Sequence, residues 1–331
     1  MDWMLWMERV EQAKARFAAL INASPDEVAV LSSVSECASA VASALDFTRG
    51  RAGIVTTEMD FPTIGHVWLA QERRGAQVSF IPEHHHTIPL EYYTRAIHEQ
   101  TLITSISHVS YYNGFKQDVK QIASIVHEKG AYLFVDAYQS AGSVPIDVKE
   151  MDIDFLAAGA QKYMLGIPGI AFLYVRKELA NQLEPTITGW FGRINPFAFD
   201  IKQLDYAHGA RRFETGTPPM ISAYAANAAL EMLNAIGVDK VETYLQALSS
   251  KAVSHAREKG LTVLSPMEVE QKAANTAIYV PQAGKAEALM KEKGFIVSAR
   301  NDVIRIAPHF YNTEEDVVAA IDTLASVLKS L

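Results

Sequence analysis

The stretch AYLFVDAYQSAG, residues 131–142, contains an apolar segment that ends on an aspartate, Asp136. A second apolar segment, in DFLAAGAQKYMLGIPG at 154–169, is followed directly by a lysine, Lys162. In an open α/β sheet, ligands bind beyond the carboxyl ends of the strands. The position of Asp136 and Lys162 at two such ends therefore predicts a ligand-binding site at that edge of the sheet. Taken singly, Asp136 also fits a helix cap, and Lys162 also fits a solvated surface lysine.

Short apolar runs alternate with amphipathic stretches through the first 183 residues. The apolar runs predict strands at 28–31, 53–57, 77–81, 101–107, 131–136, 154–159 and 170–175. The amphipathic stretches predict helices at 3–21, 36–46, 62–73, 90–99, 118–129 and 177–182. This alternation is typical of a mostly parallel sheet with helices on both faces, so we predict an α/β fold.

The pattern changes after residue 183. Residues 184–219 are rich in proline, glycine and aromatic residues, which predicts a long loop of functional importance. A helical stretch at 219–259, interrupted near Gly237, precedes an α+β pattern. That pattern predicts strands near 261–264, 275–280, 295–299 and 303–307, and helices near 284–293 and 313–330. We therefore predict a large domain at 1–235 and a smaller C-terminal α+β domain at 236–331.

Composition limits the function. The 331 residues are 49% hydrophobic and 21% charged, as in folded globular proteins, and the formal net charge of −8 argues against phosphate-directed nucleic-acid binding. The single cysteine, Cys37, excludes a disulfide framework and a multi-cysteine zinc site, and we expect no metal. We find no apolar run near the roughly 20 residues of a membrane span and no signal peptide, so we expect no membrane partner and a cytoplasmic location.

A third segment, VLSSVSECASAV at 30–41, has the pattern of a strand, a polar turn and a helix. Ser33 and Ser35 lie at the predicted helix start, where they cap the helix or help to hold a phosphate at its positive end. A phosphate turn, Asp136 and Lys162 together match the needs of pyridoxal 5′-phosphate (PLP). The lysine amine forms a Schiff base with its aldehyde, and the carboxylate pairs with its pyridinium nitrogen.

The chain resembles the class V aminotransferase group of fold-type-I PLP enzymes, which includes cysteine desulfurases, kynureninases and isopenicillin N epimerase-like proteins. The motifs occur in the family's order and cover almost the whole chain. They are SSVSEC at 32–37, TEMDFPT at 57–63, SHVSYYNG at 107–114, VDAYQSAG at 135–142, DFLAAGAQK at 154–162, RFETGTP at 212–218 and VIRIAPHFYNTEEDV at 303–317.

The resemblance implies roles for residues around the cofactor. Lys162 is the Schiff-base lysine, and Asp136 pairs with the pyridine nitrogen. Gln139 hydrogen-bonds the phenolic oxygen of the ring, and Phe61 stacks on the ring. The phosphate is held by Ser35 and the Val34 backbone N–H, and by the amide of Gln161, which stands where relatives have histidine or tyrosine.

The resemblance also implies a homodimer with shared active sites. Thr217, in the GTP turn at 216–218, reaches the phosphate bound by the neighbouring subunit. Arg305 binds the α-carboxylate of an amino-acid substrate, for which its planar guanidinium is suited by two parallel hydrogen bonds. The alternative for Arg305 is an ordinary surface arginine on a strand.

The type of reaction stays open. TGWFGRINPFAFD at 188–200 is most similar to a kynureninase-like branch, which predicts a transaminase or lyase, and elimination, Cβ cleavage and epimerisation are further possibilities. A cysteine desulfurase or cysteine lyase is an alternative, although Cys37 is not in the C-terminal region that carries the family's persulfide cysteine. The family's N-terminal arm is missing or very short, which motivates a second alternative, a non-catalytic PLP-binding scaffold.

Overall fold

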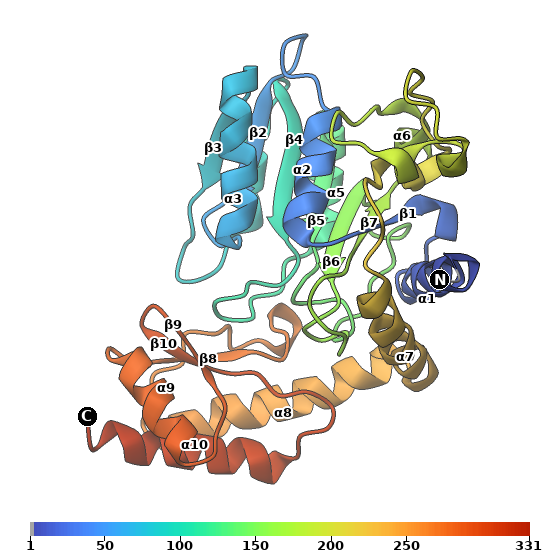
Figure 1. Cartoon of the computed structure of the whole chain (residues 1–331). Coiled ribbons are helices and arrows are strands. Elements are labelled where there is room, and N and C mark those ends of the chain that lie inside the picture. The colour runs from blue at the N-terminus through green and yellow to red at the C-terminus, as the bar shows by residue number, and fades with distance from the viewer. Residues whose placement is uncertain (1–2) are drawn as a thin grey trace.

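The computed structural model describes residues 3–331 and is built around a seven-stranded sheet (Figure 1). Its strands are β1 (Val28–Leu31), β2 (Gly53–Thr57), β3 (Gln77–Ile81), β4 (Thr101–Ser107), β5 (Tyr132–Asp136), β6 (Phe155–Gly159) and β7 (Ala171–Val175). The strand order is β1-β7-β6-β5-β4-β2-β3. Strands β3, β2, β4, β5 and β6 are parallel, whereas β7 is antiparallel to both of its neighbours. The predicted mostly parallel sheet is confirmed.

The central strands β4, β5 and β6 are almost wholly buried because helices cover both faces of the sheet. Along β5, Leu133 and Val135 belong to one core and Phe134 to the other, as the two-residue period of a strand requires. The first core contains residues of α1 (Trp3–Leu20), α4 (Leu90–Ala96) and α5 (Val119–Glu128). The second contains residues of α2 (Val34–Ala44), α3 (Pro62–Leu69) and α6 (Lys177–Gln182). Figure 1 shows α2 and α3 side by side on one face.

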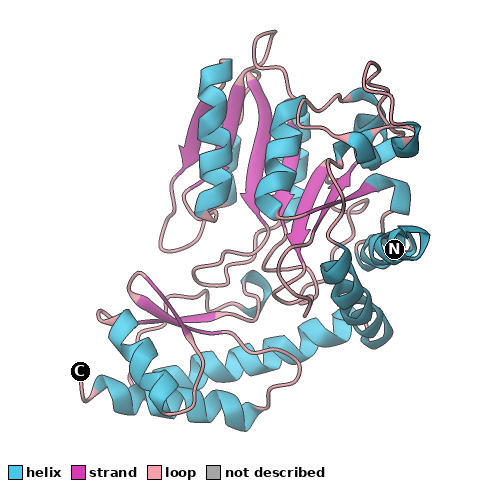
Figure 2. Cartoon of the chain, viewed as in Figure 1, coloured by secondary structure: helices cyan, strands magenta, loops and turns pink. Residues whose placement is uncertain are grey.

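After a long excursion at residues 184–219, the chain forms α7 (Met220–Ile236), which packs against α1. Gly237, with φ of 89°, separates α7 from α8 (Val238–Glu258). A second sheet consists of three strands in the order β8 (Thr276–Tyr279), β10 (Val303–Ile306) and β9 (Ser298–Arg300). Figure 2 shows this sheet below the large sheet, together with α8, α9 (Ala283–Glu292) and α10 (Glu314–Leu328). The division into domains at residues 235 and 236 stays a prediction.

The predicted strand at 261–264 is wrong. Only Val263 forms an isolated bridge, to Ile278 of β8. Pro266 follows closely, and because proline has no N–H it cannot extend the pairing. The second sheet therefore has three strands rather than four within residues 3–331.

None of the helices in residues 3–331 combines the length and the apolar character that crossing a membrane requires.

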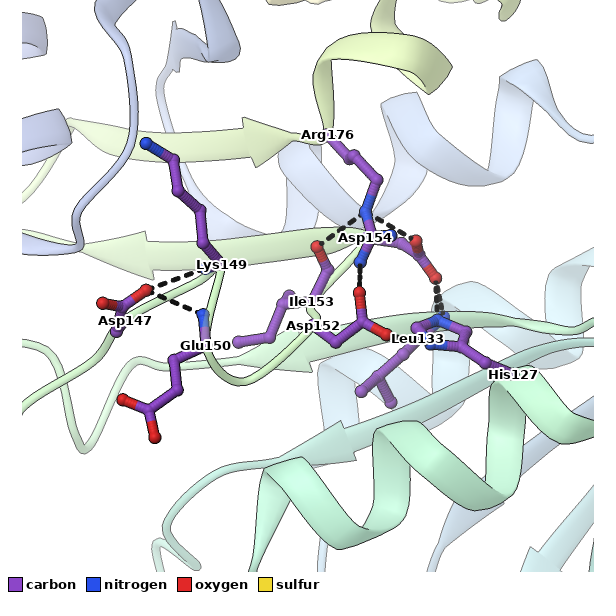
Figure 3. Close-up of polar contacts among 9 residues, drawn as sticks. All are labelled: His127, Leu133, Asp147, Lys149, Glu150, Asp152, Ile153, Asp154 and Arg176. Atoms are coloured by element: carbon purple, nitrogen blue, oxygen red, sulfur yellow. Dashed lines mark hydrogen bonds and ion pairs between the residues drawn. The ribbon is translucent and has the colours of Figure 1, made fainter.

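A charged cluster joins several elements at the amino end of β6 (Figure 3). His127, in the last turn of α5, lies between two carboxylates, with Nδ1 2.8 Å from Asp152 Oδ2 and Nε2 2.8 Å from Asp154 Oδ2. Arg176 contacts the same two carboxylates, and the Leu133 N–H donates to Asp154. Because both ring nitrogens of His127 face acceptors, this arrangement favours the doubly protonated ring.

We expect the contribution of His127 to stability to depend on pH. The hydrogen bond with Asp154 is the main cause that raises the pKa of His127. A raised pKa stabilises the fold below the unfolded pKa of about 6.5, and this contribution is lost as pH rises through the folded pKa. His127→Gln should therefore lower Tm more at about pH 6 than at about pH 9 in calorimetry. The control is His66→Gln, because His66 is an exposed histidine on another helix. An equal fall in Tm of His127→Gln at both pH values would contradict a charged His127.

Candidate active site

A cavity of about 220 Å³ lies at the carboxyl ends of β4, β5 and β6. Eight of the ten site residues predicted from the sequence line it: Ser33, Val34, Ser35, Phe61, Asp136, Gln139, Gln161 and Lys162. They come from the start of α2, the start of α3 and the segments that follow β5 and β6. A larger groove, of about 730 Å³, involves α4, α5 and α8 and contains none of the predicted residues.

Strand register brings Asp136 and Lys162 to the same edge of the sheet. Asp136 is the last residue of β5 and pairs with Ala157 of β6, which ends shortly before Lys162. The loop after β5 then packs against the backbone beside Lys162. Gly142 makes this approach possible, because a Cβ at this position, where φ is 90°, would lie 2.5 Å from the carbonyl oxygen of Tyr163.

Burial dominates the electrostatics of the two ionisable groups. It raises the pKa of Asp136 to about 6, although the Tyr138 N–H, 2.8 Å from Oδ1, and the Lys162 amine both favour the charged carboxylate. Burial also lowers the pKa of Lys162 to about 8, against the attraction of Asp136. Both groups therefore titrate close to neutral pH, which suits side chains that exchange protons with a bound ligand.

Two helix N-termini meet at the cavity. Ser33 caps α2 by accepting the Glu36 N–H at 3.2 Å. Ser35 Oγ lies 2.9 Å from Oγ1 of Thr63, which belongs to the first turn of α3. Helix dipoles, free N–H groups and hydroxyls together form a suitable place for an anion such as a phosphate. Capping and anion binding are thus compatible, since different side chains serve them.

Aromatic rings form the walls of the cavity. The Phe61 side chain is 43% exposed, and its ring lies edge-on to that of Tyr111, with centroids 5.1 Å apart. Lys162 Nζ is 5.8 Å from the Phe61 centroid and 4.3 Å from the Tyr138 centroid. Phe61 is therefore not a core residue, and its free surface beside the amine suits stacking on a flat ligand.

Arg305 does not line the cavity but lies close to it. It comes from β10 of the small sheet, and its positive charge contributes to the lowered pKa of Lys162. Its Nη1 donates to the Tyr111 carbonyl at 2.6 Å, which ties β10 to a wall of the cavity. Its buried Nε has no hydrogen-bond partner within residues 3–331. The guanidinium therefore retains capacity to bind a further acceptor.

Thr217 is exposed and does not join the cavity within one chain. The loop that carries it has a fixed base. Buried Glu214 forms an ion pair with buried Lys14 of α1 at 3.1 Å, and Thr215 donates to Glu36 Oε1 of α2 at 3.0 Å. A role for Thr217 in another subunit's site stays a prediction.

Sequence reasoning missed five residues that line the cavity: Thr63, Ser107, Val109, Tyr111 and Tyr138. All five belong to the motifs that carried the family resemblance, so the motifs themselves were the available signal. Tyr138 lies between two predicted residues, Asp136 and Gln139. The sequence does not reveal that its ring, rather than a neighbouring side chain, faces Lys162.

The residues of the cavity fit PLP. Asp136 Oδ2 accepts no hydrogen bond from the described residues, so it can accept one from a pyridinium N–H. Ser35, Thr63 and the two helix ends suit the phosphate, and Phe61 suits the ring. Residues 3–331 contain no group of three or more His, Cys, Asp or Glu side chains placed to hold a metal ion.

The family profile of Aminotransferase class-V matches residues 4–319, so the chain belongs to the class V aminotransferase family. The resemblance drawn from the motifs is confirmed, and with it the expected fold-type-I architecture and the expectation of a PLP-dependent enzyme that acts on an amino acid.

Relatives cover nearly the whole chain. An uncharacterized aminotransferase of Bacillus subtilis (strain 168), YcbU, is 47% identical over 325 residues, which are 98% of this chain and 85% of the relative. A kynureninase of Deinococcus radiodurans is 28% identical, over 100% of this chain and 80% of its own. An apo structure of a cysteine desulfurase from Thermococcus onnurineus NA1 has a TM-score of 0.90 at 23% identity, covering 99% and 86% of the two chains, and shows the shared fold.

We expect Asp136→Asn to separate function from stability. The neutral amide cannot stabilise a protonated pyridine nitrogen, so turnover of an amino-acid substrate should fall by about two to three orders of magnitude. Tm of the cofactor-free protein should not fall, because the change removes a buried carboxylate whose pKa burial raises. Steady-state kinetics and calorimetry test both parts, and near wild-type turnover would contradict the assigned role.

Proposed function

We propose that Lys162 binds PLP covalently and moves protons at its Nζ during turnover of an α-amino acid. The observation that carries this proposal is the single cavity that Lys162 shares with Asp136, the start of α2 and Phe61. Bound PLP supplies a ring that withdraws electrons from the substrate. Asp136 holds a positive charge on the ring nitrogen, Ser35 and Val34 bind the phosphate, and Phe61 orients the ring.

The remaining predicted contacts complete this proposal. Gln139 hydrogen-bonds the phenolic oxygen of the ring, and Arg305 binds the substrate carboxylate. The unpartnered Nε of Arg305 and its closeness to Lys162 support that assignment. A carboxylate held by Arg305 places the α-carbon of the substrate toward the lysine amine, which can then act as a general base.

Among reaction types we propose a transaminase or lyase of a kynureninase-like branch. A kynureninase is 28% identical across the whole chain, and a probable cysteine desulfurase of Pyrococcus abyssi is equally similar over 98% of it, so overall identity is compatible with either branch. The segment TGWFGRINPFAFD at 188–200 is the feature that favours the kynureninase-like branch. A desulfurase that passes sulfur through a protein cysteine is disfavoured by Cys37, the only cysteine of the sequence. Cys37 is fully buried in α2, and burial raises the pKa of its thiol well above the ordinary value, so it is a poor nucleophile. A cytoplasmic location stays a prediction from the sequence alone.

We further propose that the active enzyme is a homodimer in which Thr217 completes the neighbouring phosphate site. Thr217 is exposed at the end of an anchored loop, as a residue that serves another subunit must be. Large apolar side chains on the surface support contact with a second copy of this chain. They include Phe199 and Ile201 of the long excursion and Ile221 of α7, which are 71%, 95% and 81% exposed.

The covalent attachment is tested by borohydride reduction of the protein loaded with PLP. Peptide mass spectrometry should find the reduced cofactor on Lys162. Lys162→Ala should abolish turnover but retain weaker PLP binding through the phosphate contacts, whereas a non-catalytic scaffold would show no turnover in either form. A label on another lysine would overturn the assignment.

The shared site is tested by mixing two defective proteins, Lys162→Ala and Thr217→Ala. In a two-fold dimer, each mixed dimer has one site with a native lysine and a native threonine. With random exchange of subunits, activity should recover to roughly a quarter of the wild-type value. The shared site would be excluded if the activity of the mixture stayed at the mean of the activities of the two separate variants. It would also be excluded if the wild-type protein were fully active as a dilute monomer.

A further inference from the structure

Tyr138 contacts three groups of the candidate active site. Its backbone N–H donates to Asp136 Oδ1 at 2.8 Å, which fixes the start of the loop after β5. Its ring lies beneath the Lys162 amine, with Nζ 4.3 Å from the ring centroid. Its hydroxyl lies close enough to the side chain of Gln161 for that amide to oppose the effect of burial on the pKa of Tyr138. No role for Tyr138 followed from the motifs.

A glycine in the neighbouring strand makes room for the ring. Gly159 ends β6, and a Cβ on it would lie 2.5 Å from Cζ of Tyr138 and 2.7 Å from its hydroxyl oxygen. A separation below 3 Å is not tolerated, so any side chain at position 159 would displace the ring. The ring therefore rests directly on the backbone of β6, three residues before Lys162.

The environment of the ring favours interaction with a cation. The ring packs against the second core and is half-buried, so water screens its contact with the amine only partly. Desolvation strengthens the attraction between an ammonium group and the face of an aromatic ring. Burial also raises the pKa of Tyr138, which keeps its hydroxyl neutral. Phe61, the other ring near Nζ, is more distant by 1.5 Å (5.8 against 4.3 Å).

We propose that Tyr138 is a positioning residue that holds the Lys162 amine over its ring face and stabilises the ammonium form there. This inference rests on the proposed function of Lys162 and extends it. Burial and the positive charges of Arg305 and Arg300 favour a neutral amine, whereas Asp136 and the Tyr138 ring favour a charged one. The balance leaves Lys162 able to carry a proton near neutral pH.

The test measures the titration of Lys162 in the full chain after PLP has been removed. The acetylation rate of Lys162 with acetic anhydride is followed against pH by peptide mass spectrometry. In the wild type, half of the maximal reactivity is expected at a pH of about 8. Tyr138→Leu should move this midpoint down by about one unit, because the charged form loses the ring face. The neutral fraction of Lys162 at pH 7 should then rise about fivefold, from roughly a tenth to roughly a half.

Two conservative variants separate the ring from the hydroxyl. Tyr138→Phe should keep the wild-type midpoint of Lys162, since the ring remains. Fluorinated phenylalanines at position 138 keep the shape of the ring but weaken its negative face, so the midpoint should fall as fluorine is added. This series remains informative if Tyr138→Leu does not fold. Tyr92→Leu is the matched control, because that ring lies 5.8 Å from Arg95 and away from the cavity.

Each outcome decides the proposal. The proposal is supported if the pH midpoint of Lys162 acetylation falls in the Leu and fluorinated variants, keeps its wild-type value in Tyr138→Phe and does not move in Tyr92→Leu. An unchanged midpoint in the Leu and fluorinated variants, or an equal shift in Tyr138→Phe, overturns it. The assay needs no cofactor, so failure of PLP to attach to Lys162 would refute the proposed function without changing the titration result.

Discussion

Two oppositely charged side chains, buried Asp136 and partly buried Lys162, share one cavity, and their closeness depends on the arrangement of the large sheet. A charge in a low-dielectric site is unfavourable unless a partner is held nearby. Asp136 and Lys162 meet this requirement because β5 and β6 are adjacent, parallel and in a fixed register. A slip of one residue between these strands would turn the carboxylate to the opposite face of the sheet. Packing of both cores against α1, α2, α3 and α5 protects that register.

The sequence predicted most of the elements and most of the residues that line the cavity. Hydrophobic periodicity located all seven strands of the large sheet, because most of them are buried on both faces and are therefore apolar runs. It failed at 261–264, where an apolar run lacks a full partner strand. Strand pairing depends on distant residues, so a local pattern cannot distinguish a strand from a single bridge.

The missed residues have a related explanation. Motifs identify a residue by its neighbours in the chain, whereas Tyr138 owes its position to Gly159 across the sheet. Thr63 likewise faces the cavity because α3 begins beside α2, which brings it to Ser35. Arg305 was predicted from its motif alone, and its link to the Tyr111 carbonyl, which joins the two sheets, became visible only in three dimensions.

The buried ion pair between Lys14 and Glu214 has a consequence for the order in which the chain folds. Glu214 also accepts the N–H of Val30, 184 residues earlier in the sequence, and Thr215 contacts Glu36 across 179 residues. Contacts of such long range form late, because a long stretch of chain must first be ordered. During synthesis, β1 and the start of α2 emerge from the ribosome well before their partners in the loop at 214–217. The nascent chain must therefore keep one edge of its sheet exposed until the loop at 214–217 has been synthesised.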